Sequence, residues 1–234
     1  MALVKGNITA NDTTAVTAGA PFTATITTHT QNVGADGALI VNTFYKNDRN
    51  CTGVTWNGVA MTKQGTWDNN NLGAAGRYDV WYLANPDTGN HDLVETYSTG
   101  GSNVTTLITS FTGADQIAPI RQSLQDGVST SPNSKTITIL AGSMIMGVAT
   151  ARQSYSVTNC TSIDGVTRGF GFCDIDTAIS LIQLFVWTRG ATLTAGTKTV
   201  IATTNAPSFL TDNLRVEIQE AGTPPAPTRR IWVC

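Results

Sequence analysis

The sequence predicts an all-β protein, an antiparallel β-sandwich of jelly-roll-like form with an extended C-terminal arm. Charged residues make up 13% of the chain, which is about half of the roughly 25% that is usual in soluble proteins. Threonine, valine and glycine are abundant, and they favour strands and turns over helices. Apolar and polar residues alternate with a period of two, and Gly, Asn, Asp or Pro breaks this alternation about every ten residues, which is typical of sandwiches and jelly rolls.

The chain is long enough, at 234 residues, to form one large β domain. We expect residues 1–221 to make up the sandwich, with residues 1–20 as an N-terminal arm or edge strand. From Gly222 onward the sequence "GTPPAPTRRIWVC" is rich in proline, which cannot pair within a sheet. Residues 222–234 are therefore predicted to be an extended arm. No internal repeat is apparent in the sequence.

The pattern of alternation separates inner strands from half-exposed ones. The segments "ALIVNTFY", "SMIMGVAT" and "ISLIQLFVWT" are apolar on both faces and should be central strands, whereas "TATITTHT" and "VTTLITS" alternate and should each show one face to solvent. Near the C-terminus, Val216 and Ile218 alternate with polar residues, which predicts a final strand and not a helix. The predicted strands are Phe22–His29, Ala38–Tyr45, Val54–Trp56, Val59–Thr66, Tyr78–Ala84, Asp92–Tyr97, Val104–Phe111, Lys135–Leu140, Ser143–Thr150, Val166–Phe172, Ile179–Thr188, Thr197–Thr203 and Leu214–Gln219.

The clearest local signal is a hairpin turn at Asn57-Gly58, because both central residues of a type I′ turn need positive φ angles. A two-residue turn places Trp56 opposite Val59. Alternation then puts Val54, Trp56, Val59 and Met61 on one apolar face, while small and mildly polar residues occupy the other. We therefore predict that Trp56 lies in the sandwich core and does not form a sugar-binding platform.

Three segments resemble a β-sandwich module of bacteriophage virion proteins that also occurs in large exported bacterial proteins. They are "GVTWNGVAMTKQGTW", "YDVWYLANPDTGNHDLVETYS" and "ITSFTGADQIAPI". The shared motifs correspond to Val54–Thr62, Leu83–Gly89 and Ser110–Pro119, and the resemblance extends over roughly residues 20–221. It implies a structural or adhesive role, and it brings no catalytic residues with it.

The candidate catalytic residues do not form a recognisable constellation, and we expect no enzyme. The only histidines are His29 and His91, and no G-x-S-x-G nucleophile motif accompanies them. Both are predicted to be solvated. Glu95 and Glu217 are the acids considered for a glycosidase pair, and each is better explained as the solvent face of an edge or half-exposed strand.

No cofactor is predicted. Asp174 and Asp176 are two residues apart and near Asp164, so clustered oxygens could bind Ca²⁺. The sequence lacks the D-x-D-x-D-G pattern of a dedicated calcium loop, and solvated carboxylates are the favoured interpretation.

The four cysteines, Cys51, Cys160, Cys173 and Cys234, show no C-x-x-C spacing. A disulfide between Cys160 and Cys173 could close a hairpin, but reduced thiols are the favoured interpretation.

The charge pattern limits the partners. A net charge of −2 without a Lys/Arg run argues against nucleic acid, and no segment has the length of a membrane span. The N-terminus lacks the apolar run of a signal peptide. We therefore expect a protein that is made in the host cytoplasm, and the resemblance to virion modules implies that it is incorporated into the virion.

These observations favour a non-enzymatic capsid decoration (cement) or surface protein of a bacteriophage, which is expected to be homo-oligomeric and to stabilise the particle through contacts with capsid or other virion subunits. The predicted contact residues lie in the two terminal segments: Leu3, Val4, Arg229, Arg230, Ile231 and Trp232. The alternative is a carbohydrate-binding or receptor-binding adhesin module of a phage tail or extracellular fibre, with glycan contacts at Trp67, Asn69, Asn70 and Trp81.

Overall fold

A computed structural model describes residues 2–13, 21–27, 29–31, 36–46, 50–69, 76–98, 104–125, 129–130, 133–152, 161–163, 166–167, 172–176, 182–188, 193–202 and 210–222. Within these ranges the protein is all-β, as predicted, and every pairing between strands is antiparallel. The described part contains no helix, and hence none long and apolar enough to cross a membrane.

The strands form four main sheets, which we name sheets I to IV, and one small ribbon. In hydrogen-bonded order, sheet I contains β2 (Phe22–Ile26), β10 (Leu93–Tyr97), β5 (Cys51–Trp56) and β6 (Val59–Ala60). Sheet II contains β1 (Val4–Thr13), β11 (Val104–Thr112), β4 (Ala38–Lys46), β8 (Gly76–Ala84) and β7 (Thr62–Asn69). Sheet III contains β12 (Ile120–Gln125), β21 (Leu210–Ile218), β15 (Met144–Arg152), β19 (Ile182–Thr188) and β18 (Phe172–Asp176), and β13 (Ser129–Thr130) also pairs with β21. Sheet IV contains β14 (Asn133–Ile139), β20 (Gly196–Ala202), β16 (Thr161–Ile163) and β17 (Val166–Thr167), and the ribbon joins β3 (Thr30–Gln31) to β9 (Gly89–Asn90).

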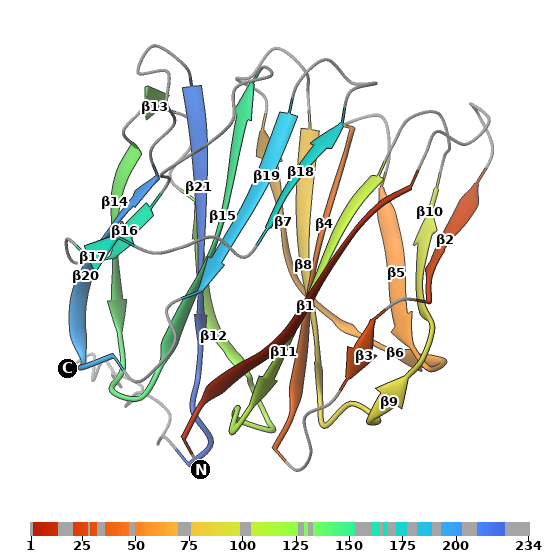
Figure 1. Ribbon diagram of the computed structural model, residues 1–234, viewed down its shortest axis with the longest axis horizontal. Helices are drawn as coiled ribbons and strands as arrows, with labels where there is room; N and C mark the ends of the chain where they lie inside the picture. Colours follow the sequence, from red (N-terminus) through yellow and green to blue (C-terminus); the bar gives the residue numbers. More distant parts are fainter. Residues whose placement is uncertain are drawn as a thin grey trace, which may run out of the picture.

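The four sheets are stacked in the order I, II, III, IV, which runs from right to left in Figure 1. Three apolar clusters fill the three spaces between them. The cluster between sheets I and II includes Ile26, Leu39, Val54, Trp56 and Trp81. The cluster between sheets II and III includes Ile40, Phe111, Met146, Leu214 and Val216. The cluster between sheets III and IV contains Ile137, Ile139, Ile145, Leu193 and Val200. Sheets II and III are therefore covered on both faces.

This stacking explains which strand predictions succeed. The apolar strands β4, β15 and β19 are inner strands with neighbours on both sides, as predicted, and the C-terminal segment forms the strand β21. The alternating strand β2 is half-exposed, also as predicted. The prediction for β11 is wrong, because all but its last residue are buried. The face of β11 that carries Val104 and Ile108 packs toward sheet I, and the face that carries Leu107 and Phe111 packs toward sheet III. The sequence contains no sign that both faces are covered.

The hairpin prediction is confirmed with one exception. Trp56 pairs with Val59, and the Trp56 side chain is fully buried. Asn57 and Gly58 have φ angles of 48° and 77°, which are the left-handed values that the turn needs. Val59, predicted to be in the core, is instead 49% exposed. The strand β6 ends at Ala60 on the outer edge of sheet I, so no neighbouring strand covers Val59.

Candidate functional site

A hollow of about 430 Å³ opens on the outer face of sheet I, beside the turn between β5 and β6. Thr55 pairs with Val94 across the two strands, and alternation places both on the face opposite to the buried Trp56. Amide, carboxylate, imidazole and hydroxyl groups therefore surround an open depression. Its lining residues are Thr55, Asn57, Gly58, Asn90, His91, Asp92 and Val94.

The hydrogen bonds of the turn fix the shape of this hollow. The backbone N–H of Asn57 donates to the carbonyl oxygen of Asp92 at 3.0 Å. The Asn57 side-chain amide donates to Asp87 Oδ2 at 2.9 Å, and Trp56 Nε1 donates to the Asp87 carbonyl oxygen at 3.1 Å. The turn is thus joined to the segments before and after β9, and the hollow is preformed in the fold.

Both histidines of the described chain contact the indole ring of Trp56. The rings of His29 and His91 each lie 5.6 Å from Trp56, centroid to centroid, in edge-on geometry. His91 is half-buried, and its Nε2 donates to the Thr88 carbonyl oxygen at 3.0 Å. Only His91 lines the hollow, so the second histidine lies beneath the surface that a ligand would meet.

The prediction that His29 is solvated is wrong. The side chain has no exposed surface. Its two ring nitrogens lie 2.9 Å from Thr9 Oγ1 and 3.0 Å from Ser110 Oγ. Burial lowers the pKa of His29 to about 4, because an uncharged imidazole is cheaper to desolvate than an imidazolium ion.

Glu95 is also buried, and the prediction that it faces solvent is wrong. It projects from β10 into the space between sheets I and II. The Tyr97 hydroxyl donates to Glu95 Oε2 at 2.9 Å, and the Thr106 hydroxyl lies 2.8 Å from Oε1. Burial raises the pKa of the Glu95 carboxyl to about 7, although these hydrogen bonds oppose the shift.

A second acid in the same layer, Asp79, forms an ion pair. Its Oδ2 lies 2.8 Å from Lys63 Nζ and accepts a hydrogen bond from the Tyr45 hydroxyl at 2.8 Å. Its Oδ1 accepts a hydrogen bond from the Thr66 hydroxyl at 2.6 Å. Lys63 also lies over the Trp81 ring, 4.9 Å from its centroid. Every partner of Asp79 belongs to a strand, so the carboxylate joins strands and does not face a cleft.

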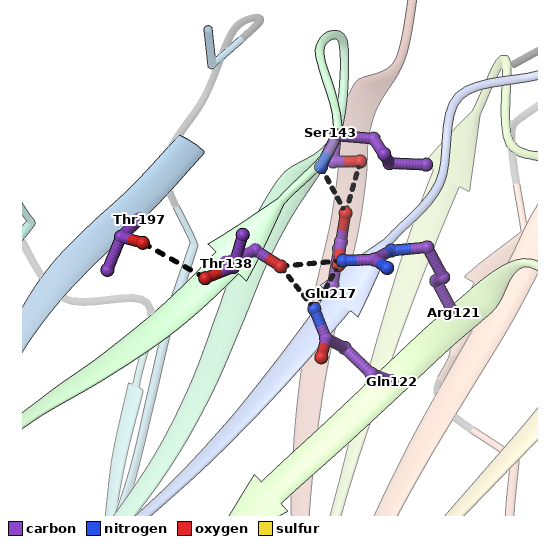
Figure 2. A network of polar contacts seen from close by, with 7 residues as sticks. Arg121, Gln122, Thr138, Ser143, Thr197 and Glu217 are labelled. Carbon is purple, nitrogen blue, oxygen red and sulfur yellow. Dashed lines mark hydrogen bonds and ion pairs between the residues drawn. The ribbon is translucent and has the colours of Figure 1, made fainter. Parts of the chain in front are cut away.

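The third buried acid is Glu217, in the second half of the chain, and its predicted solvent exposure is also wrong. Figure 2 shows its carboxylate at the centre of a polar network. Glu217 Oε1 accepts hydrogen bonds from the Ser143 hydroxyl at 2.7 Å and the Leu140 N–H at 2.9 Å. Oε2 accepts from Arg121 Nε at 2.7 Å and from Gln122 Nε2 at 2.6 Å.

The same network continues into sheet IV. The Thr138 carbonyl oxygen accepts hydrogen bonds from the Arg121 and Gln122 side chains, and the Thr138 hydroxyl lies 3.0 Å from that of Thr197 (Figure 2). Glu217 therefore links sheets III and IV. Glu95 lies between sheets I and II, so the structure does not bring the two acids of the considered glycosidase pair together.

The predicted contact residues of the termini have different surroundings. Leu3 is 2% exposed and packs into the cluster between sheets II and III, whereas Val4 is 54% exposed. Arg229, Arg230, Ile231 and Trp232 lie outside the described residues. The first terminal segment thus leaves one of its two predicted residues at the surface.

The predicted glycan-contact residues do not share one surface. Trp67 is half-buried against the cluster between sheets II and III, and Trp81 is 4% exposed in the cluster between sheets I and II. A Cβ atom at Gly65 would lie 2.7 Å from the Trp67 ring, so that ring lies over the backbone of its own strand. Asn69 is the last residue of β7, and Asn70 lies outside the described residues.

Asp174 and Asp176 belong to the strand β18. Their side chains and Asp164 are outside what the structure describes, and the described residues contain no cluster of three or more metal-binding side chains. Cys51 is a buried free thiol whose pKa is raised by burial. Cys160, Cys234 and the Cys173 side chain are not among the described groups.

The sequence analysis identifies the turn but not the hollow. Asn57-Gly58 is recognisable as a hairpin turn, while Asn90, His91 and Asp92 come from a segment more than thirty residues away. No spacing rule connects the two segments, because pairing between β5 and β10 brings them together. A ligand site formed by two strand ends in this way has no local sequence signal.

Comparison of the chain with protein-family models, with curated proteins and with solved structures found no match.

Proposed function

We propose that the protein is a non-enzymatic structural protein of a virus particle, a capsid decoration or other surface protein of a bacteriophage. The observation that carries this proposal is the use of the buried charged groups. Asp79 accepts hydrogen bonds from β4 and β7, Glu95 from β10 and β11, and Glu217 from β12 and the segment between β14 and β15. All three carboxyl groups are buried inside the sandwiches. Their hydrogen bonds join strands and layers, as suits a rigid protein that works by contact.

The surface chemistry supports the same proposal. In the part of the chain whose side chains the structure describes, exposed hydroxyl groups line the outer faces of β2, β14 and β20, including those of Thr23, Thr25, Thr136, Thr138 and Thr199. Soluble proteins usually carry charge on about a quarter to a third of their surface residues. An uncharged face loses little solvation when another subunit covers it, which suits a protein that lives against neighbours. The resemblance to phage virion modules is in line with this.

The number of copies per particle tests the proposal. Quantitative mass spectrometry of purified particles of the phage that encodes the protein should find hundreds of copies for a decoration protein and a handful for a tail or spike protein. Absence from the particle would contradict the proposal. Deletion of residues 223–234 should lower occupancy if the predicted arm makes contacts, and unchanged occupancy would remove the arm from the mechanism.

A second function, glycan binding by an adhesin module, is favoured by the hollow beside the Asn57-Gly58 turn. Its amide, carboxylate and imidazole groups suit a hydroxyl-rich ligand, and the hydrogen bonds of the turn hold it in shape. A glycan array with the intact chain should show saturable binding that Asp92→Ala weakens. Thr25→Ala is the matched control, because Thr25 is exposed on the same sheet outside the hollow. Binding that both variants leave unchanged would place the site elsewhere.

A further inference from the structure

The two halves of the chain have the same strand topology. Sheet II has five strands in its hydrogen-bonded order, and sheet III has five in its order with β13 attached to β21. Sheets I and IV each have four, and corresponding strands occupy corresponding places in each order. The correspondence runs through the chain without a crossing: β1, β2, β4, β5, β6, β7, β8, β10 and β11 match β12, β14, β15, β16, β17, β18, β19, β20 and β21. Only β3, β9 and β13 have no counterpart.

We propose that the chain is a tandem pair of one nine-stranded sandwich module, and that the outer face of the module's five-stranded sheet is a self-association surface. In this protein the second module occupies that surface on the first. The partner that this face fits is therefore a second copy of the same module.

The register of pairing repeats as well as the order. Phe111 pairs with Lys5 on one side and Ala38 on the other. Its counterpart Ile218 pairs with Ile120 and Met144. In each half the first strand then carries a bulge of one extra residue against the last strand, directly after this pair. A bulge is a conserved local feature of related sheets, so its recurrence at the same place indicates common origin.

The unusual backbone conformations recur too. Asp36, two residues before Ala38, has a φ angle of 60°, and Gly142, two residues before Met144, has one of 80°. Gly89 and Gly196 have φ angles of 113° and 123°. Gly89 lies four residues before Leu93, which pairs with Trp56, the last residue of β5. Gly196 lies four residues before Val200, which pairs with Ile163, the last residue of β16. Left-handed residues are uncommon outside special turns, and these agree in position between the halves.

Short sequence similarities accompany the matched registers. The triplet Asn-Cys-Thr occurs at residues 50–52 and again at residues 159–161, shortly before each hairpin turn, with a shift of two residues relative to the register that matches Trp56 with Ile163. Two residues separate the paired strand ends of each hairpin, Asn57-Gly58 between Trp56 and Val59 and Asp164-Gly165 between Ile163 and Val166, and both dipeptides are of the kind preferred in two-residue hairpins. The register also aligns Val80-Trp81 with Val186-Trp187, because Tyr82 pairs with Ile40 and Thr188 pairs with Met146.

The contact between the two modules has pseudo-two-fold character. The edge strand β1 lies against β18, and β7 lies against β12. Exchange of the two modules turns the first of these contacts into the second, since β1 matches β12 and β18 matches β7. An interface that uses the same patch on both partners is the isologous type found in two-fold dimers. The matched residues Leu107 and Leu214, and Phe111 and Ile218, all lie in this interface cluster.

Cleavage of the full chain between its modules tests the self-association surface. A protease site inserted between Ile117 and Ala118, which are both exposed, leaves all strands intact. After cleavage the two fragments should remain a one-to-one complex in sedimentation at micromolar concentration. Separation of two folded fragments would overturn the proposal.

Two variants of the same cleavable chain sharpen this experiment. Ile40→Ala, in the interface cluster, should raise the dissociation constant of the cleaved complex at least tenfold. Thr25→Ala, on the exposed outer face of sheet I, should leave it unchanged. Equal dissociation constants for the two variants would place the contact between the modules somewhere other than the proposed face.

The duplication itself has a separate test in the intact protein. NMR spectra of the deuterated full chain should show cross-strand contacts that give sheet IV the order β14-β20-β16-β17, which is the order of their counterparts in sheet I. Any other order in sheet IV would overturn the duplication. Neither measurement uses virus particles or glycans, so its outcome is independent of the proposed function.

Discussion

Two buried titratable residues should give the stability of this protein an unusual pH dependence. The pKa of Glu95 is raised by burial to about 7, and that of His29 is lowered by burial to about 4. Both shifts favour the uncharged form in the folded state. As the pH rises, the contribution of Glu95 to folding stability decreases while that of His29 increases. The two changes partly cancel in the wild-type protein, so replacement of one residue exposes the pH dependence that the other causes.

For Glu95, the folded protein retains a proton that the unfolded chain releases above pH 4.5. Stability from this group is therefore full below pH 4.5 and is lost as the pH rises to about 7. Glu95→Gln keeps a neutral side chain and removes this loss. We expect the stability of the variant relative to wild type to increase by on the order of 3 kcal/mol across this interval. Urea denaturation at a series of pH values measures it, and a constant difference would contradict the prediction.

For His29, the unfolded chain binds a proton below pH 6.5 that the folded state does not bind until about pH 4. Its contribution is thus present above pH 6.5 and is lost as the pH falls through this interval. His29→Gln can still hydrogen-bond to Thr9 and Ser110 but cannot titrate. Its thermal stability should fall less than that of wild type between pH 6.5 and pH 4. If the melting temperatures of the two proteins fall by the same amount over this pH range, His29 is not the titrating group.

At the scale of single elements, the β5–β6 hairpin depends on backbone conformation at Gly58. A Cβ atom added at this residue would have no other atom within 4 Å, but the φ angle of Gly58 is 77°. Gly58→Ala should therefore destabilise the protein by about 1–2 kcal/mol through backbone strain alone. Gly53→Ala is the control, because Gly53 has equally open surroundings without a left-handed φ angle. Equal denaturation midpoints for the two variants would contradict this explanation.

The Glu217 network should be the main polar link between sheets III and IV. Glu217→Ala removes an acceptor from Arg121, Gln122, Leu140 and Ser143. Arg121 and Gln122 keep the Thr138 carbonyl oxygen, but Arg121 loses its ion-pair partner and the fully buried Ser143 loses this acceptor. Loss of one partner from a buried ion pair costs about 3–5 kcal/mol. Thr197→Ala removes only the exposed end of the same network and should cost less than about 0.5 kcal/mol. Calorimetry measures both, and similar losses would show that the network acts through its exposed end.

Strand identity was readable from the sequence to a large extent, while the environment of the strands was not. Runs that are apolar on both faces locate β4 and β15, alternation with a period of two locates β21, and Asn57-Gly58 locates the hairpin. Patterning fails at β11, whose threonines look solvent-exposed but are buried. It fails in the same way at Glu95 and Glu217. A polar residue on an alternating strand indicates solvent only when nothing stacks on that face, and stacking is a tertiary property.

The candidate site was less predictable than the fold for a related reason. The glycan hypothesis selects tryptophans by residue type, and the structure places Trp67 and Trp81 on opposite faces of sheet II. The hollow instead combines a turn with a distant strand end. The repetition of the module could not be recognised from the sequence either. The identities between the two halves are only dipeptides and tripeptides, and the gaps between them differ in length from one half to the other.

For the whole molecule, the shared cluster between sheets II and III should make the two halves unfold together. Met146, in the second half, packs in one cluster with Ile40 and Phe111 from the first. Met146→Ala should therefore lower stability by about 2–5 kcal/mol. Fluorine resonances of fluorotryptophan at Trp56 and Trp81 report the unfolding of the first half. Their denaturation midpoint should decrease together with that of the second half. Thr136→Ala on the outer face of sheet IV is the control, and a first half that melts unchanged in Met146→Ala would contradict coupling.

The positions of Val4 and Gly222 have a mechanical consequence. Val4 pairs with Thr112, and the Ala221 N–H donates to the Gly113 carbonyl oxygen at 2.8 Å, so the start of β1 and the end of β21 meet at one corner of the molecule (Figure 1). A pulling force applied to both ends of the described chain would act on β1 and β21 at this corner, and hence on sheets II and III and not on the outer sheets I and IV. β1 pairs only with β11 among the described strands, whereas β21 pairs with β12, β13 and β15. Under such tension the first strand should peel away while the rest of the stack keeps its shape.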